Sequence, residues 1–198
     1  MKILLIVPDV TPRLDTVPEI RTLTSLHQVT VLSGNLSSRE LYEAAQRGNY
    51  DIIHIGAHTD TLDREDVLQV ARVASASLVV LNACSSGAMA SFLVAHGIPY
   101  VISTNIELFD AEAWKMPLTF YEYVARQEHH GEVISFPSAF GKADTGDGDY
   151  SLSVSVERIN TMSQVTQRIE ALNYKLNVTV VLLSAADVFV LILWFWGR

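Results

Sequence analysis

Short runs of consecutive apolar residues recur along the first half of the chain, and stretches with helical periodicity separate most of them. A strand that is apolar at every position belongs in the middle of a sheet with helices on both faces. The alternation predicts an α/β fold, with a mostly parallel central sheet between two layers of helices. The expected strands are Lys2–Val7, Gln28–Leu32, Ile52–Ile55, Leu78–Leu81 and Tyr100–Ile102.

Helical periodicity predicts helices after several of these strands. Ser37 and Asp63 stand where N-cap residues are expected, because their side chains can accept hydrogen bonds from the first helical N–H groups. Two later segments, Glu132–Phe136 and Tyr150–Val156, are expected to add one or two edge strands. The expected helices are Ser38–Arg47, Glu65–Ala74, Gly87–His96 and Ala111–Arg126.

His58 and Cys84 each follow the end of an expected strand, and Cys84 is the only cysteine in the chain. In open α/β sheets, sites form outside the carboxyl ends of the strands. A nearby imidazole withdraws the proton of a thiol and stabilises the thiolate, which is the nucleophile. The two residues are therefore a candidate catalytic dyad, and the N–H of Cys84, at a strand-to-helix turn, is a candidate oxyanion donor.

Each residue also has a plain structural interpretation. Lone cysteines are usually small buried hydrophobic residues. His58 on its own would be a loop histidine whose nitrogens are satisfied by neighbouring groups. Because both residues stand at neighbouring strand ends, a catalytic role for the pair is about as well supported as these structural interpretations.

The segment His54–Thr59 reads His-x-x-x-His-Thr, and the segment Ala83–Gly87 reads Ala-Cys-Ser-Ser-Gly. A third segment, Gly97–Ser103 followed by residues 110–121, reads as a strand and then a helix. In this order the segments resemble the caspase-like CHAT family of the caspase–separase clan, whose strands end in His-x-x-x-His-Gly and Ala-Cys-x-Ser-Gly. The resemblance covers about residues 50–127 and implies a caspase-like three-layer sandwich, which we assign to residues 1–140.

By this resemblance His58 is the base and Cys84 the nucleophile of a cysteine peptidase. Thr59 stands where the family usually has glycine. Its N–H is a second candidate oxyanion donor, while its side chain narrows the site. Glu107 and Asp110 are candidates for the first substrate pocket, where an acid favours a basic residue, or are exposed acids at a helix start. No cofactor and no metal ion are expected.

Composition narrows the remaining possibilities. A single cysteine excludes an intrachain disulfide and agrees with a reducing compartment. With 14 basic and 22 acidic residues there is no positive stripe for nucleic acid to follow, so nucleic acid is not an expected partner. Residues 141–156 form an acidic, glycine-rich loop with a possible edge strand. The spacing of Asp144, Asp147 and Asp149 differs from that of an EF-hand, which favours a solvated loop over a calcium site.

Val178–Trp196 is a run of 19 residues in which only Thr179, Ser184 and Asp187 are polar. A helix of this length, at ~1.5 Å per residue, crosses most of a ~30 Å hydrocarbon core. Insertion of a central Asp costs ~2.5–3.5 kcal/mol, which the Val, Leu, Ile and Phe residues offset with ~0.3–0.6 kcal/mol each. We predict a transmembrane anchor at 178–196. The alternative is a buried strand hairpin or core helix.

Residues 157–177 are expected to form an amphipathic stalk helix, with apolar residues at spacings of three and four. Either a short coiled coil or packing on the chain's own domain explains that pattern. Asp187 and Ser184, at mid-bilayer, need polar partners that a second copy of the chain would supply. Basic residues before the span favour a cytoplasmic catalytic domain. The apolar positions are Met162, Val165, Ile169, Leu172 and Leu176.

These expectations together describe a membrane-anchored, caspase-like cysteine endopeptidase that cleaves a protein or peptide at the cytoplasmic face of a membrane and forms a homo-oligomer. Related families serve in programmed death or antiphage defence, so the resemblance implies a prokaryotic defence or cell-death effector. The alternative is a non-catalytic or weakly catalytic interaction module whose C-terminal helix oligomerises and perturbs the membrane.

Overall fold

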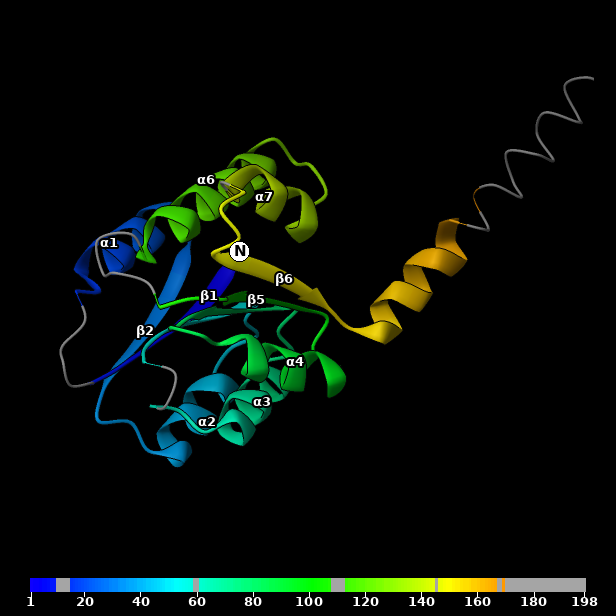
Figure 1. Ribbon diagram of the computed structural model, residues 1–198. Helices are drawn as coiled ribbons and strands as arrows, with labels where there is room; N and C mark the ends of the chain where they lie inside the picture. Colours follow the sequence, from blue (N-terminus) through cyan, green and yellow to red (C-terminus); the bar gives the residue numbers. More distant parts are fainter. Residues whose placement is uncertain (10–14, 59–60, 108–112, 145, 167–168, 170–198) are drawn as a thin grey trace, which may run out of the picture. The chain divides into compact units, whose positions relative to one another are not determined.

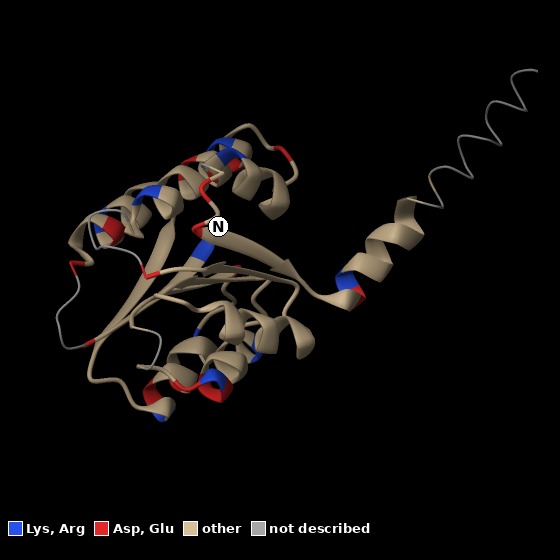
Figure 2. Ribbon diagram, in the orientation of Figure 1, with Lys and Arg blue, Asp and Glu red and all other residues tan. Residues whose placement is uncertain are grey.

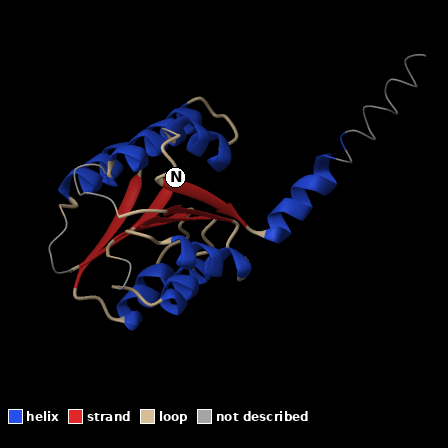
Figure 3. Cartoon of the chain, in the orientation of Figure 1, coloured by secondary structure: helices blue, strands red, loops and turns tan. Residues whose placement is uncertain are grey.

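The computed structural model describes residues 1–9, 15–58, 61–107, 113–144, 146–166 and 169. The chain divides into two compact units, Met1–Val156 and Glu157–Arg198. The first unit is built on a six-stranded sheet (Figure 3). Its strands are β1 (Lys2–Pro8), β2 (Gln28–Gly34), β3 (Ile52–Gly56), β4 (Leu78–Asn82), β5 (Tyr100–Thr104) and β6 (Tyr150–Val154).

The strands lie in the order β2-β1-β3-β4-β5-β6. Strands β1 to β5 pair in parallel, and β6 pairs antiparallel with β5. The five expected parallel strands are confirmed, and Tyr150–Val156 supplies β6. The chain leaves β1 for β2 on one side and returns to β3 on the other. The carboxyl ends of β1 and β3 therefore form a topological switch point, where open α/β sheets bind ligands.

Helices cover both faces of the sheet, which gives the first unit three layers (Figure 1). One face carries α1 (Val17–Leu26), α6 (Lys115–His129) and α7 (Phe136–Ala143), and the other carries α2 (Ser38–Gln46), α3 (Arg64–Val73) and α4 (Gly87–Ala95). Acidic and basic residues are interspersed over the helices of both layers (Figure 2). The expectation of an α/β fold with a mostly parallel sheet is confirmed.

The apolar runs of β3 and β4 are buried on both faces, as their sequence predicts. Ile53 and Val79 pack in the cluster formed with α2, α3 and α4, while Ile52 and Val80 pack in the cluster formed with α1, α6 and α7. All four side chains are at most 1 % exposed. Such burial on both faces fixes the register of the central strands, because a slip of one residue would exchange the two faces.

Both expected N-caps are confirmed. Ser37 accepts a hydrogen bond from the Glu40 N–H, and the Glu40 carboxylate accepts one from the Ser37 N–H, which completes a capping box at α2. Asp63 accepts from the Glu65 N–H at the start of α3.

The expected strand at Glu132–Phe136 is wrong, because α7 begins at Phe136. Ser135 caps this helix by accepting from the Ser138 N–H, and Pro137 in the first turn is favourable there because no helical hydrogen bond needs its missing N–H. Val133, an apolar residue that had suggested a strand, is 90 % exposed. Helix α6 also runs three residues past its expected end at Arg126, to His129. Helix α1 was not expected.

In the second unit, residues 157–166 are helical. Over the residues that the structure describes, no helix combines the length and the apolar character needed to cross a membrane. The expected anchor at 178–196, with Ser184 and Asp187, lies outside those residues. So does most of the expected stalk at 157–177 beyond Thr166.

Truncation of a side chain in β3 tests the packing of the sheet. Ile53 has no exposed surface, so we expect Ile53→Ala to lower the free energy of unfolding by about 2–5 kcal/mol. Val133→Ala removes an exposed side chain and should change it by less than about 0.5 kcal/mol. Chemical denaturation of the two variants measures both changes. Equal changes would contradict the assigned packing.

Candidate functional site

His58 and Cys84 occupy equivalent positions on two adjacent parallel strands. Gly56 at the end of β3 pairs with Asn82 at the end of β4. Each of these residues is followed by an alanine and then by His58 or Cys84, respectively. The N–H of Ala57 donates to the carbonyl of Asn82 at 3.4 Å, so the segments that follow β3 and β4 begin side by side. The structure therefore brings the two expected residues to one edge of the sheet.

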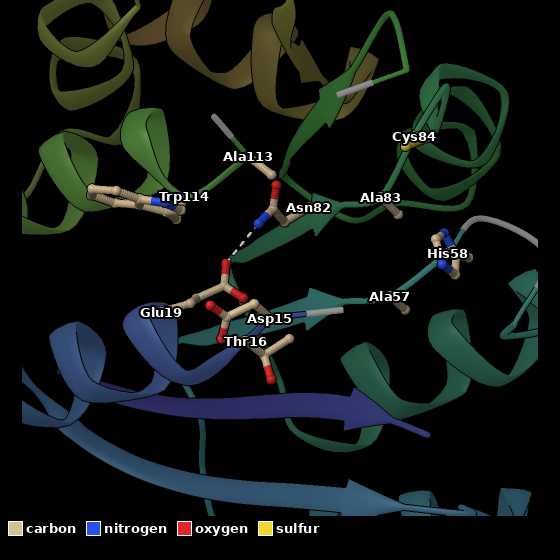
Figure 4. A pocket seen from close by; sticks show the side chains of 10 residues that line it. All are labelled: Asp15, Thr16, Glu19, Ala57, His58, Asn82, Ala83, Cys84, Ala113 and Trp114. Atoms are coloured by element: carbon tan, nitrogen blue, oxygen red, sulfur yellow. Dashed lines mark hydrogen bonds between the residues drawn. The ribbon is translucent and has the colours of Figure 1, made fainter. Parts of the chain in front are cut away.

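Both residues line a cavity of about 60 Å³ at the switch point (Figure 4). Residues that follow β1 and residues at the start of α6 complete its wall, among them Asp15, Glu19 and Trp114. In Figure 4, Cys84 and His58 lie on one side of Asn82, and Glu19 and Trp114 lie on the other. The cavity thus has a thiol and an imidazole at one end and carboxylates at the other.

The turn that carries Cys84 is held in an unusual conformation. Ser85 has a φ of 51°, in the left-handed region that costs a non-glycine residue roughly 1–2 kcal/mol. The Ser85 N–H donates to the Ile106 carbonyl at 3.1 Å, and the buried Ser86 hydroxyl accepts from the Thr104 N–H at 3.0 Å. The Thr104 hydroxyl donates to the Ala83 carbonyl. These bonds tie the turn to the end of β5, and Cys84 is half-buried at its start.

A buried polar network lies beneath the cavity. The imidazole of His54, in the middle of β3, has no exposed surface. Its Nε2 lies 2.8 Å from Oε1 of Glu19, and its Nδ1 lies 2.8 Å from the hydroxyl of Tyr121. The amide of Asn82 donates to the same Oε1 at 2.7 Å. The network joins α1, β3, β4 and α6.

The partners determine how protons are arranged in this network. Because an ionised carboxylate only accepts, Nε2 of His54 carries a proton. The other ring nitrogen, Nδ1, has the Tyr121 hydroxyl as its hydrogen-bond partner. Burial alone would raise the pKa of Glu19, but the charge and hydrogen bond of His54, with the bond from Asn82, together hold that pKa below its ordinary value. Burial and the nearby Glu19 raise the pKa of Tyr121.

A tyrosine from the antiparallel edge strand extends the network. The Tyr150 hydroxyl donates to the carbonyl of Ala113 at 2.9 Å and lies 3.2 Å from Oδ1 of Asn82. Burial, followed by the charges of Glu19, Asp149 and Cys84, raises the pKa of Tyr150. A neutral hydroxyl therefore links β6 and the segment before α6 to the end of β4.

The other expected site residues fall elsewhere. Thr59 and Asp110 lie outside the described residues, as do Ser184 and Asp187. Glu107 is exposed and does not belong to the described lining of the cavity. In the described part of the chain, no three His, Cys, Asp or Glu side chains gather as metal ligands.

The sequence analysis missed Glu19, Asn82 and Tyr121. One signal was available, because a histidine inside an apolar strand must find buried hydrogen-bond partners. His54 is such a residue, yet nothing local identifies Glu19 or Tyr121, which reach it from distant helices. Asn82, the one polar residue that ends the apolar run before Cys84, was a weaker signal of the same kind.

Comparison with protein-family models gives no match to this chain, and comparison with curated proteins gives none either. What the site can do chemically therefore rests on its own residues. A thiol and an imidazole that line one cavity can support nucleophilic attack. A buried carboxylate in the cavity wall supports recognition of a positive charge.

The pH dependence of stability tests the ionisation of Glu19. Its folded pKa lies below its ordinary value of 4.5, so the ionised carboxylate contributes stability that is present above that value and is lost as the pH falls through the folded pKa. We expect the free energy of unfolding of the wild type to fall more steeply below pH 4.5 than that of Glu19→Gln. Denaturation curves recorded across this range measure the difference.

Glu43→Gln is a matched control, because Glu43 pairs with Arg39 on the surface of α2. Its stability should follow the pH dependence of the wild type. If the stability of the wild type and of Glu19→Gln depends on pH in the same way, the network does not lower the pKa of Glu19.

Proposed function

We propose that this chain is a cysteine endopeptidase in which Cys84 is the nucleophile and His58 the general base. One observation carries the proposal: the two residues line the same cavity from equivalent positions at the carboxyl ends of adjacent strands. The strained turn at Ser85 adds support, because non-glycine residues in the left-handed region cluster at functional sites.

The proposed reaction is acyl transfer. His58 takes the proton of the Cys84 thiol, and the thiolate attacks a peptide carbonyl carbon. As the C–N bond breaks, His58 returns the proton to the departing amine, and a thioester to Cys84 remains. Water, deprotonated by His58, hydrolyses that thioester and restores the thiol. The Cys84 N–H, at the turn before α4, donates to the oxyanion. The contribution of the Thr59 N–H rests on the sequence resemblance alone.

The order of elements agrees with the proposed caspase-like CHAT family. In that family the base follows one strand and the nucleophile a later strand. Here His58 follows β3 and Cys84 follows the neighbouring β4, in a three-layer unit. The family relationship and a role as a prokaryotic defence or cell-death effector are parts of this proposal, and they rest on the resemblance of the motifs.

Selective alkylation tests the dyad. We expect iodoacetamide to label Cys84 in the wild type, and the labelling rate to fall about tenfold at neutral pH in His58→Ala, because the imidazole no longer takes up the thiol proton. His129→Ala, which removes an exposed histidine at the end of α6, should label at the rate of the wild type. Labelling rates that do not depend on His58 would exclude the dyad.

Cleavage of a peptide library is the matching test of activity. Cys84→Ala should abolish cleavage, because the nucleophile is lost. If Cys84→Ala leaves both cleavage and the cellular phenotype unchanged, the chain is instead an interaction module that acts through its C-terminal segment.

Membrane anchoring is a separate part of the proposal and rests on the sequence of residues 178–196. We expect the full-length chain to sediment with membranes and to resist extraction by high salt or carbonate, because its apolar run is long enough to span the bilayer. A chain that ends at Leu176 should be released into the supernatant. Full-length protein that stays soluble and monodisperse without detergent would show that the run is part of a core.

A homo-oligomer held by this segment is also proposed, with Asp187 and Ser184 bonding across identical helices. The basic residues that precede the span in the sequence, Arg158, Arg168 and Lys175, favour a catalytic domain that faces the cytoplasm.

A further inference from the structure

The wall of the cavity away from Cys84 holds a carboxylate that the proposed reaction does not use (Figure 4). Glu19 lies in the first turn of α1, and its side chain is only 6 % exposed. Both hydrogen bonds that it accepts, from His54 and from Asn82, fall on Oε1. Within the part of the chain that the structure describes, Oε2 makes no hydrogen bond. One oxygen of a buried carboxylate is therefore left for a ligand.

The backbone of β3 makes room for that oxygen. A Cβ atom at Gly56 would lie 2.7 Å from Oε2 of Glu19, a separation that requires one of the two groups to move. Gly56 is the last residue of β3 and stands two positions before His58. The absence of a side chain at this position lets the carboxylate rest against the strand end that leads to the proposed base.

The charge of the cavity suits a cation. Asp15 places a second carboxylate in the wall, and Trp114 adds an aromatic ring. The described lining residues include no Lys and no Arg. The lowered pKa of Glu19 keeps its carboxylate ionised at neutral pH. Buried carboxylates and aromatic rings both attract ammonium and guanidinium groups.

We infer that Glu19 is a specificity residue, and that the cavity binds the Lys or Arg side chain of the substrate residue immediately before the scissile bond. The inference rests on the proposed function, because the scissile carbonyl must lie at Cys84. Asn82 lies between Cys84 and Glu19 in Figure 4, so a side chain that joins the two ends passes Asn82. Long, unbranched basic side chains suit such a path. His54 and Asn82 act as positioning residues that hold Oε1 while Oε2 binds the cation.

Matched fluorogenic peptides test the inference in the full-length protein. One pair differs only in lysine against norleucine at the residue before the scissile bond, and a second pair differs in arginine against citrulline. In the wild type we expect kcat/KM to be about 10- to 100-fold higher for the basic member of each pair, since a hydrogen bond to a buried charge is strong. Equal or higher values for the neutral members would overturn the inference.

Substitutions then locate the source of the preference. Glu19→Gln keeps the size of the side chain and should reduce the preference to within a few-fold of unity, through KM for the basic peptides. Gly56→Ala, which displaces Oε2 without removing charge, should reduce it in the same direction. Glu43→Gln on the surface of α2 should keep the full preference. A preference that survives both Glu19→Gln and Gly56→Ala would show that Glu19 is not its source.

Alkylation of Cys84 separates failure of this inference from failure of the proposed function. Iodoacetamide has no basic side chain that could bind Glu19. The dependence of its reaction rate on His58 therefore reports the dyad alone. Normal labelling with no preference for basic peptides overturns the specificity role and leaves the peptidase intact. Labelling that does not depend on His58 removes the peptidase itself. If Glu19→Gln does not fold, the wild-type peptide ratios and Gly56→Ala still decide the question.

Discussion

The pairing of Gly56 with Asn82 is the constraint on which the site depends. Because of this pairing, β3 and β4 end side by side. His58 stands two residues after Gly56, and Cys84 stands two residues after Asn82. The pairing is itself a product of the core, because Ile53 and Val79 are buried on one face of the sheet while Ile52 and Val80 are buried on the other. A thiol and an imidazole thus reach one cavity from two strands that are held in register within an apolar core.

The polar network beneath the cavity places charged and polar side chains inside this apolar core. Burial of a charge is expensive unless hydrogen bonds and an opposite charge compensate for it. His54 contacts both Oε1 of Glu19 and the hydroxyl of Tyr121, and Asn82 adds a further donor to the same Oε1. Because these groups come from α1, β3, β4 and α6, the network orients the four elements together. A well-packed apolar substitute would fill the same space but would leave no carboxylate in the wall.

Local signals explain which features could be predicted from the sequence. The strands and the caps at Ser37 and Asp63 depend on neighbouring residues, and His58 and Cys84 were found because each follows a recognisable strand. Glu19 could not be found in this way, because its role depends on His54 and Gly56, which belong to a different element. The segment around Val133 was wrongly predicted to be a strand, because the β-propensity of its residues competes with the helix-starting residues Ser135 and Pro137.

The close approach of Glu19 to Gly56 has a consequence for how such a sequence can diverge. Any side chain at position 56 meets the carboxylate, and any shorter residue at position 19 leaves an unfilled space above the strand. A substitution at either position therefore disturbs the packing of the residue at the other. Chains that descend from a common ancestor with this architecture should therefore show the two positions changing in concert, and a shift at the pair should accompany a shift in the substrates that each lineage accepts.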